Sequence, residues 1–362
     1  MLYHFKKLDW ILIVAAVLLV GLGILSIYSS SLGRGDFLNF KKQLIFGSIG
    51  LILMFLLSFF DWRSLKENSY LIFSLYFVCL LLLGGLFFFA PEIRGTKSWY
   101  RIGPFSIDPI DVVKVVLIVL LAKYFSMRHV EMYRIKHILL SGIYVFLPSI
   151  MVFFQPNFGS TAILLAIWLG ILIISGIRLR HFLLLVLGGL IIFAASWQLF
   201  LKDYQKERII SFVRPQAGDL LEIGWNQRQS KIAVGSGRVW GQGLGSGSQT
   251  QYGFLPEPQT DFIFAALAEE TGLAGISVLF ILFSILIWRI TKIATASTNN
   301  FPRLFASGII ILLISQIFIN IGMNIGLLPI VGISLPFISY GGDGLIIVFI
   351  SLGIVQSIKI NS

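Results

Sequence analysis

Ten long apolar segments constrain the fold of this chain more than any other feature of its sequence. A helix needs about 20 mainly apolar residues to cross the hydrocarbon core of a bilayer. Only 12% of the residues are charged and 57% are hydrophobic, which excludes a soluble enzyme. The segments are residues 10–29, 43–60, 70–90, 110–127, 138–154, 161–176, 182–201, 272–290, 304–328 and 338–357. The sequence therefore predicts an all-α integral membrane protein with about ten transmembrane helices, forming a single polytopic domain over residues 1–362.

The distribution of Lys and Arg predicts the orientation in the membrane. An even number of spans places both termini on the same side. The loops and termini of that side carry thirteen Lys and Arg residues, whereas the short loops of the other side carry six. Because cytoplasmic loops are enriched in these residues, we expect both termini in the cytoplasm. The net charge of +11 is then a signal of topology, and we expect no nucleic-acid partner.

One long segment, at about residues 202–259, falls between the seventh and eighth spans and would lie outside the cell. Apolar residues such as Trp225 and Trp240 are interspersed through it, so we do not expect disorder. It is also rich in glycine, and glycine allows backbone N–H groups to face an anion. Tight turns are the alternative interpretation, because Gly-x-Gly repeats alone are weak evidence for a phosphate site. The glycines include Gly235, Gly237, Gly241, Gly243, Gly245 and Gly247.

The segment after this loop is too long for one straight transmembrane helix. Residues 260–292 as a single helix would measure about 50 Å, against a hydrocarbon core of roughly 30 Å. Such a helix would also place Glu269 and Glu270 in lipid, which is costly. We therefore expect a short interfacial helix over residues 260–270 and a span that begins at Gly272.

Two carboxylates near predicted span starts are candidate functional groups. Asp261 follows Thr260, a predicted N-cap, so it either stabilises the helix N-terminus or acts as a base at the boundary of water and lipid. Asp111 and Lys114 are three residues apart, so they form either a structural ion pair or one side of a polar cavity. Gln316, Asn320 and Asn324 recur every four residues in the ninth span and predict interhelical hydrogen bonds.

Several motifs resemble those of the SEDS family (shape, elongation, division and sporulation), and within it the RodA subfamily. The stretch GWNQRQSKIAVGSGRVWGQGLGSGSQ begins at Gly224, and it is followed by LPEPQTDFIFAALAEETG and NIGLLPIVGISLPFISYGG. Earlier matches are RGTKSWYRIGPFSIDPIDVVK, FQPNFGSTA and QKERIISFVRP. They run in order from about Arg94 to the C-terminus. Division and sporulation homologues remain alternatives to the RodA subfamily.

The resemblance implies a multi-pass peptidoglycan glycosyltransferase of the bacterial cytoplasmic membrane. Such an enzyme polymerises lipid II, which is both donor and acceptor, at the outer face of the membrane during cell elongation. Its implied partners are a class B penicillin-binding protein with transpeptidase activity, the elongation machinery and membrane lipid. The rival interpretations are a flippase or transporter of lipid-linked precursors and a non-catalytic scaffold. We find no internal repeat of the kind that many transporters show.

The resemblance also assigns roles to residues of this sequence. The essential aspartate of the TDFIFA motif corresponds to Asp261, the general base, and the Glu-x-x-Lys of span four corresponds to Asp111 and Lys114. Glycosyl transfer needs a base for the acceptor hydroxyl and cations near the departing pyrophosphate. No organic cofactor is expected, whereas a divalent cation, Mg²⁺ or Mn²⁺, could bind through phosphate oxygens and one or two carboxylates. The residues expected to bind substrate are Lys114, Asp111, Arg101, Arg208, Gln229, Ser230, Lys231, Glu257 and Thr260.

The sequence departs from the family pattern at three places. Asn157 replaces the aspartate of the QPDLGTA motif, so a role that needs its charge is in doubt. Asp108 and Asp111 stand in a motif that usually reads Gln-Pro-Ser-Glu, which shortens the acidic side chain by one methylene. Asp343 and Gly344 replace small serines after the SYGG motif. These departures indicate a divergent member that retains Asp261 and Lys114.

Overall fold

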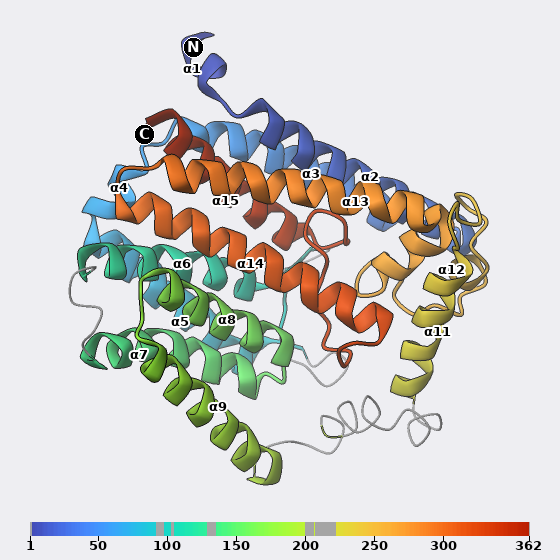
Figure 1. Ribbon diagram of the computed structural model, residues 1–362. Coiled ribbons are helices and arrows are strands. Elements are labelled where there is room, and N and C mark those ends of the chain that lie inside the picture. The colour runs from blue at the N-terminus through green and yellow to red at the C-terminus, as the bar shows by residue number, and fades with distance from the viewer. Residues whose placement is uncertain are drawn as a thin grey trace.

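Long helices follow the apolar segments of the sequence in the computed structural model, which describes residues 2–91, 98–102, 105–128, 135–199, 206 and 222–361. Each predicted span corresponds to one long helix among these residues, with ends that differ by a few positions (Figure 1). The long helices are α2 (Trp10–Arg34), α3 (Leu38–Ser58), α5 (Ser69–Phe89), α6 (Pro109–Arg128), α7 (Ile135–Phe154), α8 (Phe158–Ile174), α9 (Leu179–Leu199), α13 (Ile263–Ala296), α14 (Asn300–Ile325) and α15 (Gly342–Asn361).

Seven of these helices are long and apolar enough to cross a membrane by themselves. Two of the other three have identifiable reasons to fall short: α8 has 17 residues, and α6 carries Asp111, Lys114 and Lys123. The prediction of an all-α membrane protein is confirmed. The described residues also form four shorter helices: α1 (Leu2–Lys7), α4 (Arg63–Glu67), α11 (Glu222–Ser236) and α12 (Ser248–Gln251).

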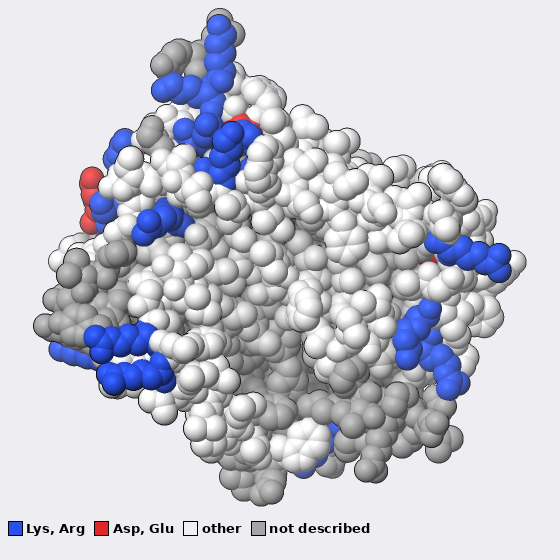
Figure 2. Space-filling model, in the orientation of Figure 1, with Lys and Arg blue, Asp and Glu red and all other residues white. Residues whose placement is uncertain are grey.

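The two ends of the bundle differ in what they carry. The N and C termini lie together at one end, whereas α11 and α12 lie at the other (Figure 1). On the face shown in Figure 2, Lys and Arg gather toward these two ends and leave a broad uncharged surface between them. Apolar side chains such as Tyr70 and Phe88 are strongly exposed, as expected for a surface that contacts lipid. The predicted placement of both termini on one side is therefore consistent with the fold.

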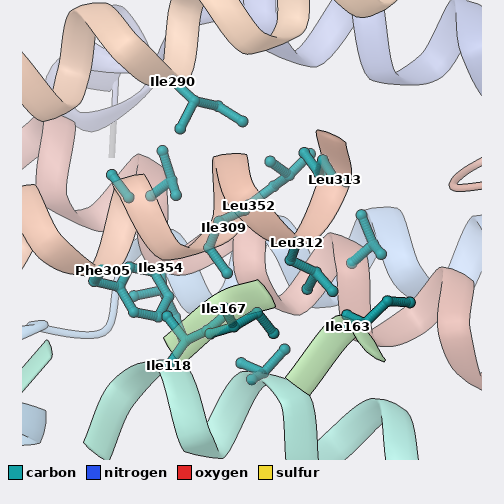
Figure 3. Packing of buried hydrophobic residues seen from close by; sticks show 14 of the residues in the cluster. Ile118, Ile163, Ile167, Ile290, Phe305, Ile309, Leu312, Leu313, Leu352 and Ile354 are labelled. Atoms are coloured by element: carbon teal, nitrogen blue, oxygen red, sulfur yellow. The ribbon is translucent and has the colours of Figure 1, made fainter. Parts of the chain in front are cut away.

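The core lies where α6, α8 and α14 pack against each other. Ile118 from α6, Ile167 from α8 and Ile309 from α14 are each no more than 1% exposed, and they point toward one another (Figure 3). On the other side, α15 packs along α3, where Gly50 leaves room for the ring of Phe349. This packing fixes the N-terminal ends of α6 and α15 relative to each other.

Helix ends follow recognisable signals. The Asp9 side chain accepts a hydrogen bond from the backbone N–H of Leu12 at 3.1 Å and caps α2. The Asn157 side chain accepts from the backbone N–H of Ser160 at 3.1 Å and caps α8 in the same way. An amide oxygen caps a helix about as well as a carboxylate. The neutral Asn157 therefore suffices for this local role.

The predicted break before the eighth span is present. The backbone of α13 is non-helical at Gly272, with φ 63° and ψ −164°, which separates a short first part from the long second part. A Cβ atom at this position would lie 2.3 Å from the backbone nitrogen of Gly241, so only glycine fits. The predicted cap was wrong, because α13 begins at Ile263 with Phe262 as its N-cap. Asp261 lies in the turn before the helix and not in its first turn.

Strands β1 (Tyr100–Ile102) and β2 (Phe105–Ile107) form a small antiparallel hairpin that no pattern in the sequence predicted. It precedes α6, and Arg101 is the direct cross-strand partner of Ser106.

Candidate active site

A cavity of about 250 Å³ lies at the end of the bundle where α6 and α15 begin. Its walls come from segments far apart in the sequence: the start of α3, the hairpin, the start of α6, the turn before α13, the loop after α14 and the start of α15. Asp261 and Asp111 both line it. The full set of lining residues is Lys42, Phe46, Trp99, Ser106, Asp108, Asp111, Thr260, Asp261, Gly332, Ser334, Tyr340, Gly341, Gly342, Asp343 and Gly344.

Lys114 and Asp111 form the predicted ion pair in the first turns of α6. The Lys114 ammonium lies 2.7 Å from the Asp111 carboxylate, and the two side chains are 5% and 19% exposed. Asp111 lines the large cavity, and both residues line a second, smaller cavity of about 20 Å³ together with Gln316. The two interpretations drawn from the sequence are thus compatible, because the pair is buried and still borders a polar cavity.

Two further carboxylates stand beside this pair. The backbone N–H of Asp108 donates to the Asp343 carboxylate at 2.8 Å, which joins the start of α6 to the start of α15. Burial and the neighbouring Asp111 and Asp343 raise the pKa of Asp108 to about 7, although Lys114 acts in the opposite direction. Asp108 and Asp343 are two of the positions at which the sequence departs from the family pattern, and the structure brings them together.

Hydrogen bonds to backbone carbonyl groups hold Asp261 and its neighbour in place. Its carbonyl oxygen accepts hydrogen bonds from the side-chain amides of Asn320 at 3.1 Å and Asn324 at 3.0 Å. The preceding carbonyl, of Thr260, accepts from the Ser339 hydroxyl at 2.7 Å. The predicted interhelical role is confirmed for Asn324, whose side-chain oxygen accepts from the backbone N–H of Ala265 in α13. Asn320 bonds to a turn and a loop instead, and both side chains are fully buried.

Thr260 and Glu257 lie next to Asp261 in one turn. The Thr260 hydroxyl lies 3.3 Å from the Glu257 carboxylate and thus helps to close the turn instead of capping α13. Glu257 has a positive φ of 41°, a conformation that costs free energy in a residue other than glycine. Thr260 lines the cavity, whereas Glu257 does not.

The other predicted substrate-binding residues that the structure describes lie outside the lining of the large cavity. Gln229 and Ser230 are buried in α11, and the Ser230 hydroxyl donates to the backbone oxygen of Asn324 at 2.9 Å. Lys231 is exposed, and its side chain lies against Gly326. Arg101 is exposed beside Ser106 on the hairpin. Arg208 falls outside the described residues.

The glycine-rich part of the long loop packs against the start of α13. The N–H groups of Gly243 and Gly245 donate to Glu270 O at 3.0 Å and to Ser29 Oγ at 2.7 Å. A Cβ atom at Gly237 would lie 1.9 Å from Ala268 O. For these glycines the anion-binding interpretation was wrong. The N–H groups of Gly243 and Gly245 are already hydrogen-bonded within the protein, and the backbone of α13 fills the space beside Gly237.

The same loop keeps two glutamates out of lipid. The Glu269 carboxylate accepts from the backbone N–H groups of Gln249 at 2.7 Å and Thr250 at 3.0 Å. Glu270 accepts from the Ser29 hydroxyl at 2.5 Å. Both side chains are at most 2% exposed. The cost that argued against a single straight helix is thus offset by hydrogen bonds from the loop.

Sequence reasoning missed some members of the cavity wall. Lys42 counted only as a topology signal, although it is the lysine among the lining residues. Trp99 and Tyr340 occur in the matching motifs, but the sequence assigned no role to either. In the structure both line the cavity and add aromatic surface beside the carboxylates. No spacing rule connects these positions, since each comes from a different element.

The side chains that line the cavity can be compared with the ligands that a divalent cation needs. Among the residues that the structure describes, no three His, Cys, Asp or Glu side chains are arranged to hold a metal ion. Four carboxylates, of Asp108, Asp111, Asp261 and Asp343, line the cavity. One or two of them could contribute oxygen ligands if phosphate groups supplied others, which is the usual pattern for Mg²⁺.

Comparison with known proteins identifies the family. The profile of a family described as cell cycle protein, FtsW/RodA/SpoVE, matches residues 9–362. The chain belongs to the FtsW/RodA/SpoVE family. This family member is 34% identical to stage V sporulation protein E of Bacillus subtilis over 97% of its own length and 96% of that protein. It is 36% identical to peptidoglycan glycosyltransferase MrdB of Escherichia coli over 78% of its length and 76% of that protein.

Solved structures support the assignment of this FtsW/RodA/SpoVE protein. One chain of a peptidoglycan synthase complex, solved to explain how polymerization and crosslinking are coordinated, superposes with a TM-score of 0.82. It is 28% identical, and the match covers 97% of each chain. The rod shape determining protein RodA of Thermus thermophilus gives a TM-score of 0.72 at 26% identity, covering 97% of this chain and 96% of that one. The SEDS membership inferred from the motifs is confirmed, whereas the RodA subfamily is not singled out.

Proposed function

We propose that this protein is a peptidoglycan glycosyltransferase that polymerises lipid II at the outer face of the bacterial cytoplasmic membrane. The observation that carries the proposal is one polar cavity at the end of a membrane bundle, which Asp261 and Asp111 both line and where Asp111 is paired with the buried Lys114. The cavity lies at the end opposite the termini, so a lipid-linked substrate can reach it while its chain stays in the bilayer. Relatives named as peptidoglycan glycosyltransferases support the assignment.

Asp261 is the general base in this proposal. The sugar hydroxyl of one lipid II molecule attacks the anomeric carbon of another sugar, and its proton passes to the Asp261 carboxylate as the bond forms. The bond between the anomeric carbon and the phosphate oxygen breaks, and the lipid pyrophosphate leaves with the electron pair. Lys114 and Lys42 supply positive charge near the leaving group. A divalent cation, if bound, would further neutralise the pyrophosphate.

The first experiment is polymerisation of lipid II by the purified protein. Asp261→Asn removes the base and keeps the shape of the side chain, so glycan strands should be lost while expression, membrane insertion and binding of a partner persist. Ser351→Ala, a buried hydroxyl that bonds only within α15, provides a matched control with full activity expected. Polymerisation by a well-expressed Asp261→Asn protein at the wild-type rate would remove Asp261 from the mechanism.

The same assay addresses the rival interpretations. A flippase would move lipid II across vesicle membranes without making strands, and a scaffold would do neither. Only a polymerase yields glycan strands when no other glycosyltransferase is present. Strands that form only after another glycosyltransferase is added would favour the scaffold.

The cellular role we propose is elongation, as in the RodA subfamily. The motif Pro329–Gly332 supports it, together with the likeness to MrdB and to the solved RodA. A role in division or sporulation is the alternative, and it is favoured by the match to the sporulation protein along nearly the whole chain. Depletion in growing cells distinguishes the first two, since loss of an elongation polymerase gives round cells and loss of a division polymerase gives filaments. A phenotype confined to spores would indicate the third.

We also propose a class B penicillin-binding protein as the partner and a cytoplasmic position for both termini. The similarity to a chain of a peptidoglycan synthase complex supports the first. The excess of Lys and Arg on the terminal side supports the second. Co-purification with tagged transpeptidases of the host tests the partner, and protease accessibility of a C-terminal tag in spheroplasts tests the orientation.

A further inference from the structure

The side chains of Asn320 and Asn324 form the strongest polar network that the glycosyl-transfer chemistry does not use. Both belong to α14, one turn apart, and both are fully buried. Neither lines the cavity. They nevertheless converge on one atom, the backbone oxygen of Asp261, with distances of 3.1 and 3.0 Å.

The orientation of both amide groups follows from their partners. The Asn320 NH₂ group also faces the carbonyl oxygen of Ile333 at 2.7 Å, and the Asn324 NH₂ group faces the carbonyl oxygen of Asn320 at 2.8 Å. Backbone carbonyls only accept hydrogen bonds, so these groups must be the donors. At its other end, the Asn324 oxygen accepts from the backbone N–H of Ala265 at 3.2 Å.

This network connects the segments on either side of the proposed base. Ile333 follows Gly332, which lines the cavity opposite the Asp261 carboxylate: a Cβ atom on Gly332 would lie 3.6 Å from Asp261 Oδ2. Asn320 therefore holds two neighbouring parts of the wall against one helix. Asn324 holds the same carbonyl and the first turn of α13, and it accepts the Ser230 hydroxyl of α11.

We infer that Asn320 and Asn324 are positioning residues that set the place and direction of the Asp261 side chain in the cavity. Asp261 lies in a turn, outside regular helix, so no helical hydrogen-bond ladder fixes its backbone. Two buried donors on its carbonyl provide that restraint instead. The inference rests on the proposed function for its effect on catalysis, but the restraint itself is a statement about structure.

Loss of either asparagine should reduce the turnover rate more than substrate affinity. A displacement of about 1 Å at a catalytic group can lower a rate by about 100-fold, so we expect Asn320→Leu to reduce kcat by about 10- to 100-fold. The lipid II concentration for half-maximal rate should stay within about 3-fold, because no lining residue changes. Asn324→Leu should behave alike.

A matched control separates positioning from general loss of packing. Gln356 is also fully buried, and its amide donates to a backbone oxygen, that of Asp9 at 3.1 Å, at the terminal end of the bundle. Gln356→Leu should lower the thermal unfolding temperature about as much as Asn320→Leu and leave kcat unchanged. If Asn320→Leu does not fold, Asn320→Ala removes the same two donors without adding bulk or charge.

A second measurement does not depend on activity. The chain has one cysteine, Cys79, which is buried. Asp261→Cys in a Cys79→Ala background therefore provides a single thiol at the cavity, whose reaction with a small water-soluble maleimide reports its position. Adding Asn320→Leu should change the labelling rate several-fold, whereas adding Gln356→Leu should not.

The outcomes distinguish this inference from the proposed function. If the wild-type protein makes no strands, the glycosyltransferase proposal fails and the labelling rates still test the restraint. If the wild-type protein is active and Asn320→Leu retains kcat with unchanged labelling, the positioning role is refuted. Equal losses of kcat in Asn320→Leu and Gln356→Leu would also refute it, because the effect would then be one of stability.

Discussion

Replacing Lys114 with methionine tests whether its charge serves the substrate or only balances Asp111. The Lys114 side chain is 5% exposed and lies 2.7 Å from a carboxylate that is 19% exposed. Removing one partner of a buried pair typically costs about 3–5 kcal/mol, because the other charge is left uncompensated. Asp111 borders a cavity that water can enter, so we expect the lower part of that range.

The double variant Asp111→Leu with Lys114→Met removes both charges together. Apolar replacements of a buried ion pair are often neutral or stabilising, so thermal unfolding in detergent should return close to the wild-type value. Polymerisation should not return, because one of the two lysines proposed to offset the charge of the leaving pyrophosphate is then missing. The assay is the initial rate of glycan synthesis against lipid II concentration, measured for both variants at equal protein concentration. Size-exclusion chromatography first checks that each variant is folded.

Each result has a separate meaning. Recovery of both stability and polymerisation in the double variant would refute a substrate role for Lys114 and leave a structural pair. Recovery of stability alone supports the charge-neutralising role. If the unfolding temperature does not recover, the two side chains must stabilise the fold by more than their mutual ion pair.

Three further predictions concern pH, charge and backbone. The pKa of Asp108 is raised from 3.8 to about 7, so the folded state binds more protons than the unfolded state between these values. Stability should therefore fall as pH rises through this window. Asp108→Asn should weaken this dependence in thermal unfolding scans, and titration of the neighbouring Asp343 carboxylate accounts for part of what remains. Lys42→Met should raise the lipid II concentration for half-maximal rate, whereas Lys231→Met, outside the cavity lining, should not. Gly272→Ala should lower the unfolding temperature, because its Cβ would meet the backbone of Gly241; an unchanged value would contradict the tight packing.

Local spacing was enough to predict several features of the site. The Asp111–Lys114 pair follows from three residues of separation on a helix, and the break at Gly272 follows from comparing helix length with membrane thickness. The four-residue spacing of Asn320 and Asn324 predicted that they share one helix face and bond to a neighbouring element. In each case the residues named lie along one helical segment of the sequence, so their relative positions follow from the helical repeat.

The features that were missed depend on how separate elements meet. Lys42 reaches the cavity because α3 packs along α15, and nothing in the spacing of apolar residues specifies that pairing. The glycine-rich loop invited an anion-binding interpretation because glycine fits both an anion site and close packing. The position of Glu269 and Glu270 beside the loop decides between these two interpretations. Their carboxylates and backbone oxygens already accept hydrogen bonds from N–H groups of the loop.

The charge balance of the cavity leads to a last prediction about a divalent cation. Four carboxylates and one lysine, Lys42, line the cavity in which a pyrophosphate would have to sit. Lys114 lines only the smaller cavity, where it neutralises Asp111. Even with Asp108 protonated, the wall has a net negative charge that opposes an anionic substrate. The described residues form no group of three side chains suited to a metal, so phosphate oxygens must complete the coordination and the cation should bind with lipid II. Mg²⁺ or Mn²⁺ alone should therefore leave the unfolding temperature of the chelator-treated protein unchanged, whereas cation and lipid II together should raise it more than lipid II alone. A large shift with cation alone would mean that the protein holds the ion by itself, and the same shift in Asp343→Asn and Asp108→Asn variants would place that site away from this cavity.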